Sequence, residues 1–291
     1  MLYAFFDAVG ELDRIAFRRQ IEVCIAAGAH GIAMLGLITE VGALSVGERQ
    51  KLARWAVEDI GGRLPVMATI AGQTVEEARA LALDAKAAGA AYLIFQPPLG
   101  QRPTSSELLE YYSNTFADID TDVGIQNAPE FLGVGLNPEE VATLRQRHET
   151  FTLMKGEGPF VQVKAFVDAL GKDFAILNGR GGLELPDNLL GGCAGMVPAP
   201  DCADVQVAIY EAIQSGDLDG AKALYARVLP YIVFSMQTID VAILYGKRMF
   251  ARRAGIDNDC ACRMPKLKPN AFLDAAMERW SVDFGAYGRR A

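Results

Sequence analysis

Short apolar runs alternate with longer stretches of helical periodicity along most of the chain. The runs have the length of strands, and the stretches between them repeat their apolar residues at the spacing of an amphipathic helix. Eight segments are candidate strands, namely residues 2–6, 31–35, 65–70, 91–96, 123–127, 152–155, 174–177 and 195–197. Repeated strand–helix units of this kind favour an α/β fold with a parallel sheet.

Capping signals mark several of the predicted helix starts. Ser45, Thr74 and Thr104 are each followed three positions later by a glutamate. This spacing is the capping box, in which two side chains satisfy free backbone amides reciprocally. Asn137 precedes a proline at the first helical position, which is a further start signal.

Eight alternations fit a TIM (β/α)8 barrel better than an open doubly wound sheet, although the sequence alone leaves the open sheet possible. After about residue 203 the pattern predicts only helices, over residues 203–215, 218–234, 236–255 and 269–280. We therefore predict a barrel over residues 1–217. A small C-terminal helical extension over residues 218–291 is expected to pack on it.

Composition narrows the class of protein. The net charge of −8 argues against nucleic acid or an anionic membrane surface as a partner. No apolar run reaches the roughly 18 residues of a membrane span. The first residues lack the basic region of a signal peptide, so none is expected. The 5 cysteines have no paired zinc-type spacing, so we expect free thiols in a cytoplasmic protein without a metal site.

Lys155 ends an apolar strand, and two interpretations of it are open. Strict alternation places Phe151, Leu153 and Lys155 on one face of that strand. On an outer face, Lys155 is a solvated rim charge. On the inner face of a barrel it is a buried amine at the catalytic end, where burial favours the neutral form that attacks carbonyl groups.

Other polar residues also fall at the carboxyl ends of the predicted strands. Arg180 lies in a glycine-rich turn, which is either a phosphate-binding loop or simply a tight turn. His30 and His148 precede their strands and therefore map to the opposite, amino-terminal face. Any proton transfer at the catalytic face must then use groups other than histidine.

Several motifs together resemble the dihydrodipicolinate synthase/N-acetylneuraminate lyase family of class I aldolases, from residue 5 to about residue 231. Residues 36–40 resemble the family's carboxylate-binding loop, and residues 126–129 fall at its Tyr-Asn-x-Pro motif. Lys155 falls at the Schiff-base lysine, and residues 191–198 resemble the glycine stretch that leads to the last strand.

The resemblance implies a Schiff-base lyase that needs no cofactor. Lys155 would attack a 2-oxo acid such as pyruvate, and the backbone amides of Leu37, Ile38 and Thr39 would bind its carboxylate. Arg180 could neutralise a distal anion. The resemblance also implies a homo-oligomer, either a dimer or a tetramer.

The chain departs from the family at the groups that move protons. Gln126 replaces the relay tyrosine, and a neutral amide cannot act as an acid or base near neutral pH. The loop at residues 96–101 has no second tyrosine, and residues 130–132 lack the family's arginine. Glu157, an ordered water or the substrate would have to supply the proton donor, and the other interpretation of Glu157 is a salt-bridged or solvated loop carboxylate.

Three functional hypotheses remain from the sequence. The first is a Schiff-base lyase, in which Gln126 and Asn127 orient the substrate, although Asn127 is equally suited to a turn. Its apolar pocket would suit an apolar or aromatic aldehyde partner. The second is a non-catalytic ligand-binding relative, and the third is a phosphate-binding barrel enzyme that forms no imine.

Overall fold

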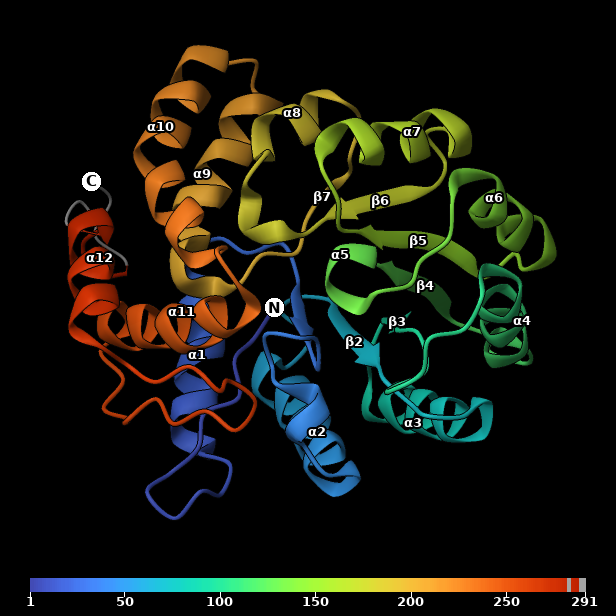
Figure 1. The fold of residues 1–291 in the computed structure, drawn as a ribbon, viewed down its shortest axis with the longest axis horizontal. Helices are drawn as coiled ribbons and strands as arrows, with labels where there is room; N and C mark the ends of the chain where they lie inside the picture. The colour runs from blue at the N-terminus through green and yellow to red at the C-terminus, as the bar shows by residue number, and fades with distance from the viewer. Residues whose placement is uncertain (282–283, 288–291) are drawn as a thin grey trace.

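A curled parallel sheet forms the centre of the computed structural model, which describes residues 1–281 and 284–287 (Figure 1). Seven strands of the described residues follow one another in chain order without reversal. They are β1 Ile32–Met34, β2 Val66–Ile70, β3 Tyr92–Phe95, β4 Asp122–Asn127, β5 Phe151–Gly156, β6 Ala175–Asn178 and β7 Gly195–Met196. An open doubly wound sheet reverses its strand order at a switch point. The sequential order therefore confirms the predicted barrel class.

Helices surround this sheet and follow its strands in turn (Figure 1). The first eight are α1 Arg14–Ala26, α2 Val46–Ile60, α3 Val75–Ala88, α4 Ser105–Phe116, α5 Pro129–Leu132, α6 Pro138–Arg147, α7 Phe160–Leu170 and α8 Leu185–Leu190. They are followed by α9 Ala203–Gln214, α10 Leu218–Ser235, α11 Ile239–Ala254 and α12 Ala271–Ser281. Short 3-10 turns are η1 Val41–Ala43, η2 Arg180–Gly182 and η3 Pro200–Cys202.

The predicted strand at residues 2–6 is wrong as a ladder strand. The segment is buried, and the Leu2 amide donates to the Ala33 carbonyl at 2.8 Å. The backbone of Tyr3 is hydrogen-bonded by a side chain and not by a neighbouring strand. The Gln20 side chain accepts from the Tyr3 amide at 2.8 Å and donates to the Tyr3 carbonyl at 3.0 Å. Apolar patterning predicted the burial correctly, but it does not encode which group satisfies the backbone.

The helix starts follow the predicted capping chemistry closely. Ser45, Thr104 and Asn137 each form the complete reciprocal box with the glutamate three residues later. Thr74 forms only half of it, since its hydroxyl accepts from the Glu77 amide at 3.2 Å. The Glu77 carboxylate instead accepts from the amide of Gln73, one residue before the cap, at 2.8 Å.

The helices after residue 217 share a core with the last barrel helices. One cluster of buried apolar side chains joins Leu185 of α8 and Ile209 of α9 to Val228 of α10 and Met277 of α12. Helix α11 begins later than predicted because the Thr238 side chain caps it. The division of the chain at residue 217 stays a prediction.

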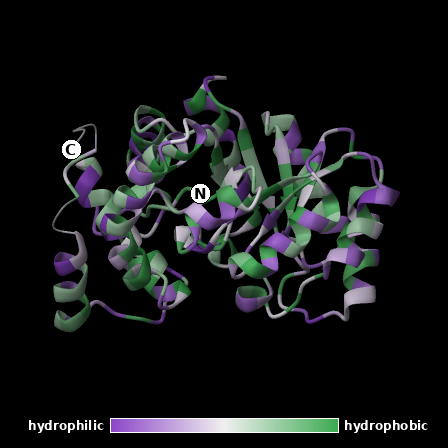
Figure 2. Ribbon diagram, turned by 90° about the horizontal axis from the view of Figure 1, so that it is seen from above, coloured by the Kyte–Doolittle hydropathy of each residue, from purple (hydrophilic) through white to green (hydrophobic). Residues whose placement is uncertain are grey.

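Hydrophobic and hydrophilic residues alternate around the helices, as the helical periodicity requires (Figure 2). The buried side chains of α1, α2 and α3, for example, are mostly apolar. In the part of the chain that the structure describes, no helix combines the length and apolar character needed to cross a membrane.

Candidate active site

Three neighbouring strands bring polar side chains into one row inside the barrel. Gln126 of β4 pairs in register with Lys155 of β5. Gln96 directly follows β3, whose last residue pairs with Ile125, so it falls beside Gln126. Lys155 is only 5% exposed. The lysine is therefore an interior group, and the solvated rim interpretation is wrong.

Glu157 turns back toward this row, as the flexible Gly156 between it and Lys155 allows. Its Oε1 atom lies 3.2 Å from Nζ of Lys155, and both side chains are buried. The Glu157 amide donates to the Asn127 carbonyl at 2.8 Å, which fixes the turn. A Cβ atom on Gly179 would lie 2.1 Å from Oε1 of Glu157, so only glycine leaves room for the carboxylate there. The solvated-loop alternative for Glu157 is excluded.

A chain of amide hydrogen bonds leads to the other oxygen of Glu157. Nε2 of Gln126 donates to Oε2 of Glu157, and Nε2 of Gln96 donates to Oε1 of Gln126 at 2.7 Å. Both glutamines are fully buried. The predicted residues Lys155, Gln126 and Glu157 are thus in contact. Gln96 is a site residue that the sequence analysis missed, since its only signal was its place at a strand's carboxyl end.

The loop after β1 supplies fewer free amides than predicted. The Thr39 amide donates to the Gly36 carbonyl at 3.0 Å, and the Thr39 hydroxyl donates to the Leu2 carbonyl at 2.6 Å. These hydrogen bonds count against the predicted role of Thr39 in binding a substrate carboxylate, because both of its donors serve the turn. Within the described part of the chain, the amides of Leu37 and Ile38 have no protein acceptor.

Asn127 has the structural role that the sequence left as an alternative. Its Nδ2 atom donates to the Leu136 carbonyl at 2.9 Å, and its Oδ1 atom accepts from the Leu136 amide at 2.8 Å. Both ends of the amide hold the segment after α5 in place. The prediction that Asn127 orients the substrate is therefore not supported.

Arg180 reaches the cavity of Lys155 but carries two carboxylate partners. Its Nη1 atom donates to Glu184 at 2.6 Å, and its Nε atom lies 3.3 Å from a Glu130 oxygen. Burial raises the pKa of the Glu184 carboxyl. Two acids beside one guanidinium leave little positive charge for a substrate anion. This arrangement counts against both predicted roles of Arg180, as a distal anion site and as part of a phosphate loop.

A cavity of about 40 Å³ lies in front of the lysine. Apolar and charged side chains share its wall, among them Leu37, Ile38, Phe131, Lys155, Glu157 and Arg180. Both hydrophobic positions of the predicted binding loop, Leu37 and Ile38, thus line the cavity of the lysine. The site is small and combines an apolar side with one ion pair.

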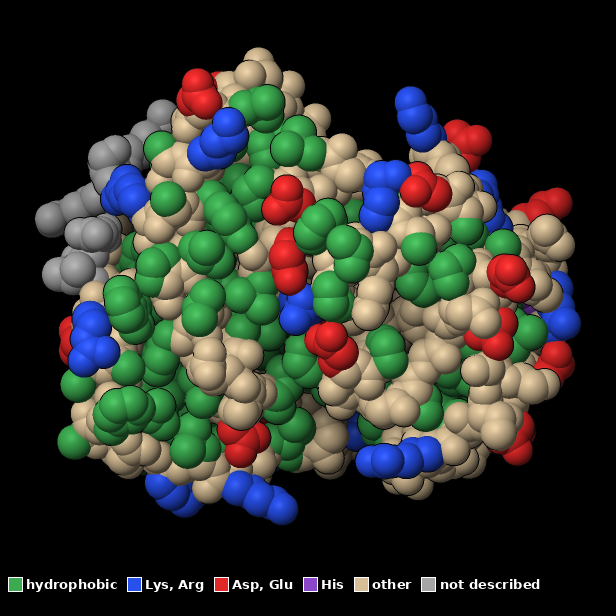
Figure 3. All heavy atoms as spheres, turned by 45° about the horizontal axis from the view of Figure 1, so that its top comes forward, with side chains coloured by type: hydrophobic (Ala, Val, Ile, Leu, Met, Phe, Trp, Pro, Cys, Tyr) green, Lys and Arg blue, Asp and Glu red, His purple; other side chains and the backbone are tan. Residues whose placement is uncertain are grey.

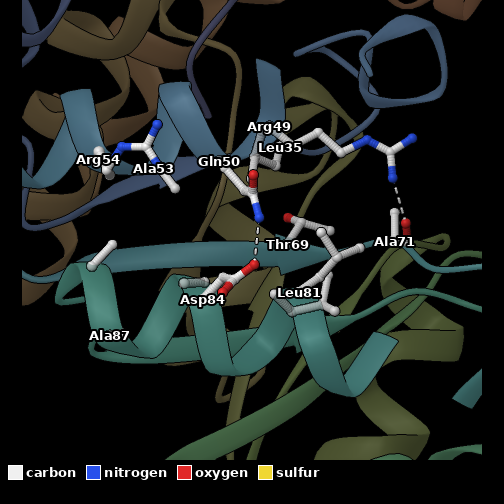
Figure 4. Close-up of a pocket in the computed structure, with 13 residues that line it drawn as sticks. Leu35, Arg49, Gln50, Ala53, Arg54, Thr69, Ala71, Leu81, Asp84 and Ala87 are labelled. Atoms are coloured by element: carbon white, nitrogen blue, oxygen red, sulfur yellow. Dashed lines mark hydrogen bonds between the residues drawn. The ribbon is translucent and has the colours of Figure 1, made fainter. Parts of the chain in front are cut away.

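A second cavity, of about 270 Å³, lies between α2 and α3 against β2, away from Lys155 (Figure 4). Three of its polar side chains make local hydrogen bonds. Nη1 of Arg49 donates to the Ala71 carbonyl at 2.7 Å, and Gln50 donates to Asp84 at 2.5 Å. It contains none of the predicted site residues.

Neither histidine belongs to the lysine cavity, as predicted. Nε2 of His30 lies 2.9 Å from a Glu211 carboxylate oxygen at the surface. His148 contacts the Ser113 hydroxyl at 2.7 Å, and burial lowers the pKa of its imidazole. Lys155 and Glu157 are an ionisable pair in contact at this site.

Known proteins share this fold and this sequence pattern. The model of the dihydrodipicolinate synthetase family matches residues 1–271. The 4-hydroxy-tetrahydrodipicolinate synthase of Syntrophobacter fumaroxidans is 29% identical over 222 residues, covering 76% of each chain. That of Methanoculleus marisnigri is 29% identical over 227 residues, covering 77% of each chain.

Solved structures agree with this fold. Dihydrodipicolinate synthase from Aquifex aeolicus superimposes with a TM-score of 0.89 at 21% identity, covering 99% of this chain and 97% of that one. A prophage protein of the dihydrodipicolinic acid synthase family from E. coli K12, solved in complex with pyruvate, gives 0.88 at 21% identity, covering 96% and 95%.

The fold and the buried lysine define the class of Schiff-base lyases built on a TIM barrel. Within that class, the chain belongs to the dihydrodipicolinate synthetase family. Membership confirms the predicted resemblance and the prediction of a lyase of the class I aldolase type. Gln126, at the tyrosine position of the family motif, marks this chain as a divergent member.

Proposed function

We propose that Lys155 forms a Schiff base with a small 2-oxo acid such as pyruvate, and that the iminium serves as the electron sink for carbon–carbon bond cleavage, condensation or dehydration. The observation that carries the proposal is the buried Lys155–Glu157 pair, with 3.2 Å between Nζ and Oε1, at the wall of a cavity. A nucleophile and a proton acceptor in contact are the requirement for this chemistry.

Glu157 supplies the proton transfers that tyrosines supply elsewhere in the family. It takes a proton from the Lys155 ammonium, and the freed amine attacks the ketone carbon while the C=O π bond breaks. Glu157 then carries a proton from nitrogen to the new oxygen and returns one to expel that oxygen as water. The ammonium and the ketone thus become an iminium and one water, and Glu157 ends as a carboxylate.

The substrate carboxylate is held by the amides of Leu37 and Ile38. Both residues line the cavity of Lys155. Both amides lack a protein acceptor among the described residues. Backbone amides without a protein acceptor are good donors to a carboxylate. Their apolar side chains, with Phe131, suit an apolar or aromatic aldehyde as the second reactant.

Borohydride trapping tests the proposal directly. The protein is incubated with pyruvate and a panel of 2-oxo acids, reduced with borohydride, and mapped by peptide mass spectrometry. A stable adduct is expected on Lys155. The absence of an adduct with every 2-oxo acid would leave the ligand-binding hypothesis, and binding of inorganic phosphate alone would favour the enzyme without an imine.

The role of Glu157 is tested in the same assay. Glu157→Gln keeps the shape of the side chain but removes its proton transfer, so adduct formation should slow by about a hundredfold. Its pH dependence should also change. Glu211→Gln, at an exposed carboxylate beside His30, is the matched control. An unchanged rate and profile in Glu157→Gln would rule out the proposed role.

We further propose a cytoplasmic homo-oligomer, either a dimer or a tetramer. Apolar side chains gather on the face that carries α8 and α10 (Figure 3), where Leu190, Leu218 and Val233 are exposed. Exposed apolar patches commonly mark contact surfaces between proteins. Sedimentation velocity should show a species larger than 31.4 kDa, and a monomer at every concentration would refute the proposal.

A further inference from the structure

The orientation of two buried amides is dictated by the carboxylate of Glu157. A carboxylate only accepts hydrogen bonds, so Gln126 must present its Nε2 atom to Oε2 of Glu157. Its Oε1 atom then faces Gln96, which must donate from its own Nε2, at 2.7 Å. The donors therefore run in one direction, from Gln96 through Gln126 to Glu157.

Burial makes it energetically costly to reverse the donor direction of these hydrogen bonds. Both glutamines are 0% exposed, so bulk water does not replace a lost donor. Among residues 1–281 and 284–287, Oε1 of Gln96 has no hydrogen-bond partner. An unsatisfied buried acceptor costs about 1–3 kcal/mol. If the Gln96 amide were flipped, two carbonyl oxygens would face each other, which is worse.

We propose that Gln96 is a positioning residue for the reaction at Lys155. Its amide locks Gln126 as a donor to Oε2 of Glu157, and this anchor keeps Oε1 of Glu157 toward Nζ of Lys155. The two amides transfer no proton themselves; they hold the group that does. The inference rests on the proposed Schiff-base function and adds to it a residue without direct contact to the reacting atoms.

The charged groups around the row come from several elements. Lys155 of β5 is the cation in contact with Glu157. Arg180 of η2 and Asp201 of η3 line the same cavity, and Arg180 is already paired with Glu130 and Glu184. A new charge at position 96 would therefore act first on Gln126 and through it on Glu157.

Two substitutions of Gln96 distinguish positioning from simple packing. Gln96→Met keeps the length but removes the donor, so trapping of the pyruvate adduct should slow by at least about tenfold at every pH. Gln96→Glu should slow it when the introduced carboxyl is ionised, because that group then competes for the Nε2 donor of Gln126. When protonated, the same carboxyl donates to Oε1 of Gln126 as Gln96 does.

The rate of Gln96→Glu relative to the wild type should therefore rise toward one as the pH falls, while the ratio for Gln96→Met stays low and flat. Burial favours the neutral form of the introduced carboxyl, which brings the recovery toward neutral pH. Borohydride trapping on Lys155, measured as a rate at saturating pyruvate across pH, gives both ratios. A packing defect alone would not produce the recovery.

Gln20→Met is the matched control, since Gln20 is an equally buried glutamine that hydrogen-bonds backbone groups away from the row. It should lower the melting temperature but leave the trapping rate within about twofold. A ratio for Gln96→Glu that does not change with pH overturns the positioning role and leaves the Schiff-base function intact. A wild-type protein without any adduct overturns both. If Gln96→Met does not fold, the pH dependence of Gln96→Glu alone decides.

Discussion

Two buried lysine–glutamate pairs in this chain have opposite characters. In the first, Nζ of Lys247 lies 2.7 Å from Oε1 of Glu40, and both side chains are 0% exposed. Oε2 of Glu40 accepts from the amides of Arg263 and Met264, each at 2.7 Å. Lys247 also donates to the Ala261 carbonyl at 2.9 Å. Both oxygens of Glu40 and two of the three donors of Lys247 are thus bonded to protein groups.

The second pair, Lys155 and Glu157, is looser and incomplete. Its closest separation is 3.2 Å, and both residues line a cavity. In the described part of the chain, Nζ of Lys155 has no backbone or second side-chain partner. The pair retains bonding capacity that a substrate can use.

The difference shows how the same two residue types serve structure or chemistry. Full coordination offsets the desolvation of both charges and fixes neighbouring segments, and Glu40 directly follows the turn that carries the Leu37 and Ile38 amides. Incomplete coordination beside a cavity is what the proposed role of Lys155 as a nucleophile requires. Completeness of the hydrogen bonds therefore separates the two roles better than burial does.

The largest expected effect is on imine formation. Lys155→Arg keeps the positive charge beside Glu157 but places a group there that stays protonated. We expect complete loss of the borohydride-trapped adduct with a melting temperature close to the wild type. Peptide mapping measures it. An adduct that moves to Lys247 would break the comparison between the two pairs.

The second effect is on stability rather than chemistry. Lys247→Met leaves the Glu40 carboxylate buried and without its cation, which should cost about 3–5 kcal/mol of unfolding free energy. Urea denaturation measures it. The double variant Lys247→Met/Glu40→Met should recover much of the loss, since it removes both charges. A double variant as unstable as the single one would contradict the assignment.

A smaller effect on the trapping rate is expected at Gly179, whose backbone lies against the Glu157 carboxylate. Gly179→Ala would place a Cβ atom 2.1 Å from Oε1 of Glu157 and so displace the carboxylate from Lys155. Trapping should slow by about tenfold with little change in pyruvate half-saturation. Gly47→Ala is the control, because a Cβ atom there meets nothing within 4 Å. Equal rates in the two variants would mean that Glu157 is free to move without consequence.

The smallest effect concerns Asp201, a buried acid at the same cavity. Burial raises the pKa of its carboxyl above the ordinary value. The folded protein then keeps a proton that the unfolded chain has lost, so stability falls as the pH rises between the ordinary and the raised pKa. Asp201→Asn should flatten this slope in denaturation curves across pH. Asp219→Asn, at a nearly fully exposed side chain, should leave it unchanged.

Much of the candidate site could be predicted from the sequence, because the carboxyl ends of the strands were identifiable. Lys155, Gln126 and Glu157 lie at the carboxyl ends of two neighbouring strands, and they meet as expected. The hydroxyl and amide of Thr39 serve the turn, which counts against its predicted role, and a sequence does not state which acceptor a donor will find. Gln96 was missed for a related reason, since a glutamine after a strand has no signature of its own.

The sequence by itself favoured the barrel class and marked most of the helix starts, because periodicity and capping act over a few residues, but it left the burial of Lys155 open. Only the tertiary structure decided which charges and amides meet. Gln20 satisfies the backbone of Tyr3, Lys247 reaches Glu40 across 207 positions, and Gln96 aligns Gln126. These contacts join distant segments, and the tertiary fold sets them.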